Sequence, residues 1–422
     1  MNQPLVGRIV IRTVVLGTLL VLSAAPGWGV KRRAFVTSVA GPGNLDLWLG
    51  AIGATALDKA DALCRARAGA GGLPNAATYR AWLSTATTDA YCHVQGASGQ
   101  KADACSGAAL PGGGPWYLAN GVNTFAGTLD ELTGPERILY RPVMLDENLA
   151  EVAAGAQQIW TGTFADGVGT GHSCSDWSSA SAGTLGTFGQ ALRTARIWTY
   201  SSFESCDGSR RLLCLEPGPS EVTILGWSPG SLVFVSSASG DADLSSWPGA
   251  GGAVGLDAAD NVCRSLAAAA HLPAPQSFFA WLSDSQQDAA DRLTSDGPFR
   301  RVDGYAIAST KADLLDGTVG NGIHVFENGS YEVAPPFTVW TETAADGTSL
   351  GTACDDWTSI LASLPAVRVG DSTSARTESW TDYVSRSCDS PFARLYCLSN
   401  AVTLFWDGFE NGAISRWSSS VP

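Results

Sequence analysis

The sequence predicts an α+β protein composed of two similar units that disulfide bonds stabilise. Three observations lead to this prediction. The motifs of the first half recur in the second, each repeat begins with a helical pattern and continues in short β-rich segments, and ten cysteines follow an export signal. With 422 residues the chain is long enough for two domains. Charged residues make up 16% and hydrophobic residues 45%, a composition that argues against disorder.

Residues 1–29 have the pattern of a secretory signal peptide. Arg8 and Arg12 precede an apolar run over residues 14–22, and the small residues 23–25 follow it. The run is about half as long as the roughly 20 apolar residues that a membrane-spanning helix needs, so we expect cleavage rather than anchoring. No later segment resembles a membrane span. The mature protein is therefore expected to be secreted or to lie at the cell surface.

The rest of the chain is a duplication. The first unit spans residues 31–217, the second spans 231–399, and residues 218–230 form a linker rich in proline and glycine. The tail, residues 400–422, lies outside both repeats and contains a Phe-x-Asp-Gly-Phe-Glu-x-Gly motif. The matching segments, in chain order, are 34–38 and 233–237, 57–64 and 256–263, 81–84 and 280–283, and 160–177 and 340–357.

Each unit has the same predicted order of elements. A strand at 35–37 is followed by a helix over 57–64, whose apolar residues fall on one face. A second short helix is expected to end near residue 79, and short strands and Gly/Ser/Asp-rich loops continue to a closing strand at 212–215. This order predicts one compact α+β domain per repeat. The corresponding elements of the second unit are expected at 234–235, 256–263, before 278 and at 395–398.

The ten cysteines predict five disulfide bonds, because export places them in an oxidising compartment. No pair has the Cys-x-x-Cys spacing of zinc ribbons and redox motifs. Cys92 and Cys105 occur only in the first unit and lie in one loop, so we expect them to pair with each other. The other cysteines are common to both units, and their spacing alone leaves the pairing open. They are Cys64, Cys174, Cys206 and Cys214 in the first unit and Cys263, Cys354, Cys388 and Cys397 in the second.

Together these motifs resemble those of a known domain. In order they are Phe-Val-Thr-Ser, Leu-x-x-Ala-Asp-x-x-Cys, Ala-Trp-Leu-Ser, Trp-Thr-x-Thr, Cys-x-Asp-Trp and Leu-x-Cys-Leu, and they are similar to the bacterial endostatin-like domain, a relative of the C-type lectin-like fold. The resemblance covers both units. It implies two tandem C-type-lectin-like domains in an exported bacterial protein, each with early helices and a looped antiparallel β region. The disulfide pairs that it implies are Cys64 with Cys214, Cys174 with Cys206, Cys263 with Cys397, and Cys354 with Cys388.

The chain departs from calcium-dependent lectins at the place where those proteins bind sugar. Residues 202–205 and 384–387 precede the penultimate cysteine of their units, and neither segment offers the paired oxygens that hold Ca²⁺ and a sugar diol. Five other aspartates cluster beside the Trp/Cys motifs, where they are either ligands of a hard cation such as Ca²⁺ or residues of Asp-Gly turns and loop hydrogen bonds. We favour the turns and expect no cofactor. The five are Asp166, Asp176, Asp346, Asp355 and Asp356.

Aromatic residues divide into a repeated and a non-repeated set. The repeated tryptophans are expected in the cores, because duplicated units share cores more reliably than binding sites. They are Trp82, Trp160, Trp177 and Trp198, with Trp281, Trp340, Trp357 and Trp380 as their partners. The non-repeated aromatics fall in predicted variable loops and are candidate ligand contacts, since exposed aromatic rings offer large rigid surfaces. They are Trp116, Tyr117, Tyr140, Tyr305 and Tyr331.

Asp61 and Asp260 recur beside the apolar face of the first helix of each unit. A buried carboxylate at this place either has a raised pKa suited to catalysis or accepts backbone hydrogen bonds from a neighbouring loop. Its presence in both units favours the structural role.

The charge and the motifs of the sequence argue against several classes of function. A net charge of −14 argues against binding of nucleic acid or anionic membranes. The sequence contains no Gly-x-Ser-x-Gly or His-Glu-x-x-His motif, and no histidine recurs between the units, so an enzyme is not expected. We expect a non-catalytic, adhesin-like binding protein whose loops recognise an extracellular protein or glycan. The alternatives are a structural cell-surface protein and a secreted polysaccharide hydrolase. The sequence predicts neither the ligand nor the oligomeric state.

Overall fold

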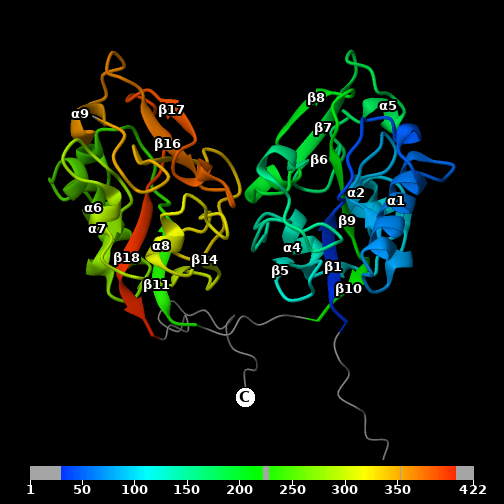
Figure 1. Ribbon diagram of the computed structural model, residues 1–422, viewed down its shortest axis with the longest axis horizontal. Helices are drawn as coiled ribbons and strands as arrows, with labels where there is room; N and C mark the ends of the chain where they lie inside the picture. Colours follow the sequence, from blue (N-terminus) through cyan, green and yellow to red (C-terminus); the bar gives the residue numbers. More distant parts are fainter. Residues whose placement is uncertain (1–29, 222–227, 352, 405–422) are drawn as a thin grey trace, which may run out of the picture.

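The computed structural model describes residues 30–221, 228–351 and 353–404. Two lobes lie side by side, the first unit on the right of Figure 1 and the second on the left. Each lobe combines helices with β-sheet, so the chain is an α+β protein. The predicted signal peptide, residues 1–29, and the Phe-x-Asp-Gly-Phe-Glu-x-Gly motif lie outside the described residues.

The first unit is built on one large sheet. Eight strands belong to it, in the order β5-β4-β1-β9-β6-β7-β8 with β2 paired to β9. Its strands are β1 (Arg32–Val36), β2 (Arg80–Ala81), β4 (Trp116–Leu118), β5 (Thr124–Ala126), β6 (Gln158–Trp160), β7 (Leu185–Gln190), β8 (Ser202–Ser205) and β9 (Arg211–Leu215). The helices are α1 (Ala56–Ala70), α2 (Ala90–His93), α3 (Ala104–Gly107), α4 (Leu129–Thr133) and α5 (Cys174–Trp177).

The second unit repeats this plan in two sheets, β12-β18-β11-β13-β14 and β15-β16-β17. A parallel bridge between Val339 and Arg394 joins them where β6 pairs with β9 in the first unit. The strands are β11 (Gly230–Val235), β12 (Phe278–Ala280), β13 (Phe299–Arg301), β14 (Ala306–Ala308), β15 (Thr338–Trp340), β16 (Val367–Asp371), β17 (Val384–Arg386) and β18 (Tyr396–Thr403). The helices are α6 (Gly255–Ala269), α7 (Ala289–Arg292), α8 (Lys311–Leu314) and α9 (Cys354–Trp357).

The unit boundaries differ from the expected ones at two places. Strand β18 continues to Thr403, because its last residues pair with the start of β11. In the first unit, β10 (Gly218–Pro219) pairs with β3 (Gly113–Gly114), so the first residues of the predicted linker belong to the folded unit.

Local sequence explains the long helix of the first unit. Thr55 caps α1: its side chain accepts a hydrogen bond from the Asp58 amide, and the Asp58 carboxylate accepts one from the Thr55 amide. Asp61 then ties the helix to the sheet by accepting a hydrogen bond from the Ala81 amide at 2.9 Å. Asp260 accepts the corresponding bond from Ala280 at 3.0 Å. The predicted structural role of both aspartates is confirmed.

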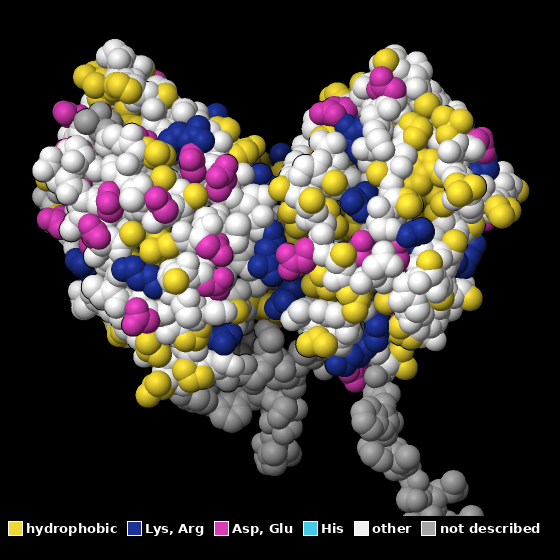
Figure 2. Space-filling model, in the orientation of Figure 1, with side chains coloured by type: hydrophobic (Ala, Val, Ile, Leu, Met, Phe, Trp, Pro, Cys, Tyr) yellow, Lys and Arg dark blue, Asp and Glu magenta, His cyan; other side chains and the backbone are white. Residues whose placement is uncertain are grey.

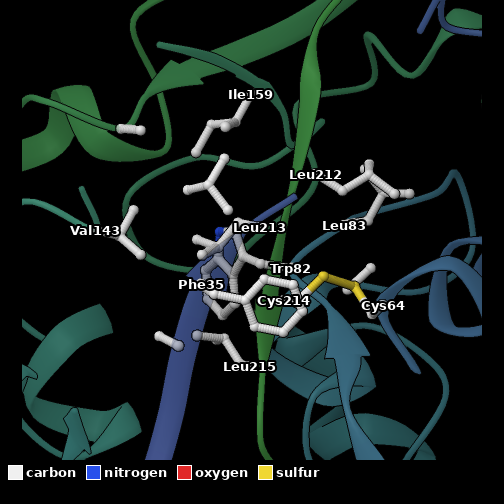
Figure 3. Packing of buried hydrophobic residues seen from close by; sticks show 14 of the residues in the cluster. Phe35, Cys64, Trp82, Leu83, Val143, Ile159, Leu212, Leu213, Cys214 and Leu215 are labelled. Carbon is white, nitrogen blue, oxygen red and sulfur yellow. A yellow bond between two sulfur atoms is a disulfide. The ribbon is translucent and has the colours of Figure 1, made fainter. Parts of the chain in front are cut away.

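The repeated tryptophans form the centres of the two cores, as predicted. All eight are at most 2% exposed. They pack in matched pairs: the ring centroids of Trp82 and Trp198 lie 5.2 Å apart, and those of Trp281 and Trp380 lie 5.4 Å apart. Figure 3 shows buried residues of the first core, among them Trp82, Phe35 and the disulfide between Cys64 and Cys214.

Five disulfide bonds hold the units, and no cysteine is free. In each unit one bond joins the long helix to the last strand, Cys64 to Cys214 and Cys263 to Cys397. The others join Cys174 to Cys206, Cys354 to Cys388, and Cys92 to Cys105. These are the pairs expected from the resemblance and from the shared loop. Within the described residues, no helix is long and apolar enough to cross a bilayer.

The lengths of the closed loops predict how much each disulfide stabilises the first unit. Cys64 and Cys214 are 150 residues apart, whereas Cys92 and Cys105 are 13 apart. On the chain-entropy account, the long bond contributes about 5 kcal/mol and the short one about 3 kcal/mol. We therefore expect the double variant C64A/C214A to lose more unfolding free energy in guanidinium titration than C92A/C105A. Equal losses would contradict this account.

Candidate ligand site at the junction of the two units

The two units meet through equivalent backbone segments. Residues 192–194 pair with 373–375 in an antiparallel bridge centred on Arg193 and Ser374. These two residues follow the ends of the corresponding strands β7 and β16 by the same number of residues. Each unit therefore meets its copy across a pseudo-twofold axis, as in a symmetric dimer. The hydrogen bonds run from the Thr194 amide to the Thr373 carbonyl, 3.0 Å, and from the Ala375 amide to the Leu192 carbonyl, 3.1 Å.

Ion pairs between the units flank this bridge. Arg193 is 6% exposed and forms an ion pair with Asp371 of the second unit. Its guanidinium also lies over the Tyr383 ring, 5.1 Å from the centroid. Farther out, the Arg376 guanidinium lies 3.0 Å from a Glu151 oxygen. Charges of opposite sign thus fix the orientation of one unit against the other.

Three of the five predicted ligand-contact aromatics come together at the junction. The rings of Tyr140 and Tyr305 stack with centroids 5.0 Å apart, and Tyr331 meets Tyr140 edge-on at 6.3 Å. Tyr305 is 3% exposed. These rings therefore contact each other across the two units, and their surfaces are largely covered by the junction itself.

The expectation of exposed loop positions is wrong for Trp116 and Tyr117. Both lie in β4, which pairs with β1 on one side and β5 on the other, and both are at most 1% exposed. The indole N–H of Trp116 donates to the Glu216 carbonyl at 2.9 Å. Trp116 is therefore part of the packed core of the first unit.

A buried polar network extends from the tyrosines. Arg301 donates to the Tyr140 carbonyl of the other unit at 2.7 Å and pairs with Asp303 at 2.6 Å. The Tyr331 hydroxyl donates to the same carboxylate at 2.9 Å. Burial raises the pKa of Asp303, but Arg301 and Tyr331 lower it more, so the pKa lies below its usual value. The carboxylate is therefore ionised and fully engaged.

His324 completes this network as a neutral side chain. Burial, together with the nearby charge of Arg301, lowers the pKa of His324 to about 3. Its Nε2 lies 3.0 Å from the Leu139 carbonyl of the first unit, and its Nδ1 lies 3.2 Å from an Arg301 nitrogen. The Gly322 carbonyl lies 3.0 Å from the same Nδ1, but it accepts a hydrogen bond from Arg301 at 2.9 Å. Because the arginine can only donate, we assign the tautomer in which Nδ1 accepts and Nε2–H donates across the junction.

A cavity of about 430 Å³ opens beside the tyrosines, with walls from both units. Apolar side chains line it together with amides, among them Leu118, Met144 and Ile307 and the amides Asn120, Asn123 and Asn321. Its volume falls within the range of small-ligand sites, and charged side chains, among them Arg141 and Asp313, make its wall more polar than that of most such sites. In Figure 2, Lys and Arg side chains gather between the two lobes on the face in view.

Two polar groups in the cavity wall lack protein partners within the described chain. Arg141 is partly buried, and its Nε has no hydrogen-bond acceptor. Asn321 is 3% exposed; its amide nitrogen donates to the Ala306 carbonyl, but its Oδ1 has no donor. The pKa of Arg141 is lowered to about 10, chiefly by burial, so the group stays charged at neutral pH.

The predicted cation ligands are engaged in local hydrogen bonds. Asp166 and Asp346 accept amide hydrogen bonds from Val168 and Thr348, both at 3.1 Å, as residues of Asp-Gly turns do. Asp176 and Asp356 accept from the Ala86 amide at 2.7 Å and the Ser285 amide at 2.9 Å, and Asp355 is exposed. Over the described ranges, no three His, Cys, Asp or Glu side chains group in a way that could hold a metal ion. These hydrogen bonds agree with the interpretation of the aspartates as residues of turns and loop hydrogen bonds.

Sequence reasoning missed Arg141, Arg193, Arg301, His324 and Asn321. Their common signal is that the two units differ at these positions. For example, Leu145 and Val325 are equivalent, because the carbonyl of each accepts a hydrogen bond from the end of its unit's first strand. Arg141 and Asn321 each lie four residues before them and are therefore equivalent to each other. A search for differences between equivalent positions would have found this pair.

The buried neutral histidine predicts a pH dependence of stability. In the unfolded chain His324 takes up a proton below about pH 6.5, whereas in the folded protein its pKa is about 3. The unfolded state therefore binds more protons in this window, and stability falls as pH decreases. We expect the unaltered protein to lose about 1.4 kcal/mol more per pH unit between pH 6 and 4 than His324→Gln. Denaturant titrations at several pH values measure this difference. The exposed position His271, changed to Gln, is the control, and parallel profiles for His324→Gln and the unaltered protein would contradict the assignment.

Comparison with known proteins does not identify a family for the chain. No family model matches it, and no curated protein matches its sequence. The function of the junction is therefore inferred from its own residues.

Proposed function

We propose that the protein is an exported, non-catalytic binding protein of adhesin type, composed of two tandem C-type-lectin-like domains, that recognises an extracellular protein or glycan. The cavity between the units carries this proposal. It has the volume of a small-ligand site and includes Arg141 and Asn321, each with a polar atom that no protein group satisfies. Unsatisfied buried polar atoms cost stability, which favours a role in contacting a ligand.

Other features agree with the domain type and the compartment. In each unit the first and last strands pair antiparallel, β1 with β9 and β11 with β18, and a disulfide joins the long helix to the last strand. Five disulfides suit an oxidising extracellular environment. A surface location on a bacterial cell follows from the predicted export signal and the resemblance.

Binding accounts for the cavity better than hydrolysis does. Two carboxylates line the cavity, Glu151 and Asp313. Glu151 is paired with Arg376, and Asp313 accepts a hydrogen bond from the Ser309 amide at 2.5 Å. Both carboxylates are exposed and have protein partners, whereas the acid of a glycosidase lies in a buried, apolar environment.

A bulky residue in the cavity wall tests the proposal. Ala306 is exposed and lines the cavity, so Ala306→Trp fills the space without disturbing the core. We expect binding of the mature protein on an array of glycans and matrix proteins to be lost in this variant. Ala312→Trp, at an exposed position outside the cavity, should bind normally. Equal binding by both variants would place recognition elsewhere, and absence of any binding would favour a structural role.

Chelation tests the part that calcium plays. Four aspartates of the predicted cation set, Asp166, Asp176, Asp346 and Asp356, already accept hydrogen bonds from backbone amides, so a metal ion is not needed to hold their loops. We expect array binding to be unchanged when EDTA replaces calcium in the buffer. Loss of binding with EDTA, restored by added Ca²⁺, would revive the cation site at Asp166, Asp176, Asp346, Asp355 and Asp356.

A further inference from the structure

Arg141 differs from the other arginines of the junction in having no carboxylate partner. Arg193 pairs with Asp371, Arg301 with Asp303, and Arg376 with Glu151. Among the residues that the structure describes, no carboxylate lies within ion-pair distance of Arg141. Its guanidinium lies over the Tyr305 ring, 5.3 Å from the ring centroid. Arg141 therefore lines the cavity without an ion pair, and the carboxylate of Asp303 acts on it only from beyond ion-pair distance.

The surroundings of Arg141 favour an anion as its partner. The guanidinium is partly buried in the wall of the cavity, and withdrawing a charge from water is costly unless it is paired. Stacking against Tyr305 restricts the orientation of the guanidinium plane. A planar guanidinium with free N–H groups matches the two oxygens of a carboxylate. A carboxylate carries one negative charge where a phosphate carries up to two, and this difference favours the carboxylate because Asp313 also lines the cavity.

The amides of the cavity indicate what else the ligand carries. Asn321 is buried, and its Oδ1, which protein atoms cover in the structure, has no donor; a ligand hydroxyl or N–H group supplies one when the side chain turns toward the cavity. Asn120 and Asn123 line the same cavity. Amide side chains of this kind bind hydroxyl groups as donors and as acceptors. A carboxylate together with several hydroxyl groups, in a space of about 430 Å³, describes a uronic-acid saccharide one or two rings long.

We propose that the cavity between the two units binds an acidic saccharide, with Arg141 as the partner of its carboxylate and Asn321 as the acceptor of a hydroxyl hydrogen bond. This proposal rests on the proposed binding function and names its ligand class. The asymmetry of the site follows from the duplication, since the equivalent position holds a cation in the first unit and a neutral amide in the second.

The test is calorimetric titration of the mature, disulfide-bonded protein with digalacturonic acid. Galactobiose, a neutral disaccharide, and N-acetylglutamate, a non-sugar carboxylate, are the comparison ligands. We expect digalacturonic acid to bind the unaltered protein saturably. Galactobiose should bind the unaltered protein about 10- to 100-fold more weakly, and so should digalacturonic acid bind Arg141→Gln. Binding should also weaken as salt concentration rises. Arg376→Gln removes a cavity arginine that already has a partner, so it should affect binding less.

Asn123→Asp provides a second variant that keeps Arg141 in place. It adds a negative charge to the cavity at a partly buried position, so it should weaken the binding of digalacturonic acid more than the binding of galactobiose. Thermal melting of each variant shows whether the fold is kept. If Arg141→Gln fails to fold, the discrimination between acid and neutral sugar in Asn123→Asp decides the question.

The other outcomes overturn the proposal. Equal affinity for digalacturonic acid and galactobiose, or full binding by a folded Arg141→Gln, removes the role of the carboxylate. If N-acetylglutamate binds tightly and digalacturonic acid does not, the site recognises a carboxylate but not a saccharide. If neither compound binds, both parts of the proposal are excluded. An array ligand that Ala306→Trp blocks and Arg141→Gln leaves unchanged would overturn this inference while the proposed function stands.

Discussion

The reciprocal backbone bridge at Arg193 and Ser374 determines the architecture of the junction. Because the bridge pairs a residue with its own equivalent, every other contact near it brings matching surfaces of the two units together. The tyrosine cluster, the Arg301 network and the cavity all lie on these matching surfaces. Hydrophobic cores hold each unit by itself, but the candidate site exists only where the units meet.

A pseudo-twofold junction also explains why the site is asymmetric. In a true dimer each surface position would occur twice, so a cation near the axis would face its own copy. Duplication within one chain lets the two copies differ. Leu118 and Arg301 occupy the same register next to the opening strand, beside Ala34 and Val233, yet one is apolar and the other anchors the network. Arg141 and Asn321 differ in the same way. The differences turn a symmetric contact into a directional one.

The sequence predicted the contents of each unit better than their junction. The tryptophan cores, the Asp61 and Asp260 contacts and the pairing of Cys92 with Cys105 follow from repetition or from local spacing, both of which can be read along the chain. Trp116 and Tyr117 were predicted to lie in a loop, but they belong to β4, which pairs in parallel with β1. Helices α1 and α2 separate the two strands in the sequence, and such non-local pairing leaves no periodic signal. Tyr140, Tyr305 and Tyr331 were selected as non-repeated aromatics, but their meeting depends on how the units dock, which no motif within one unit encodes.

The unpaired polar atoms of Arg141 and Asn321 show that the candidate site depends on the stability of the fold around it. A partly buried guanidinium and a buried amide oxygen without partners both destabilise the unliganded protein. Such groups persist where the surrounding structure is stable enough to hold them. Here each unit is closed by a disulfide between its long helix and its last strand, and tryptophans fill its core. His324 and Arg301 then connect the units within a few residues of Arg141, through the carbonyls of Leu139 and Tyr140. Side chains of the opposite unit therefore hold the backbone next to Arg141, and its guanidinium, which lies over the Tyr305 ring, is restricted before a ligand pairs with it.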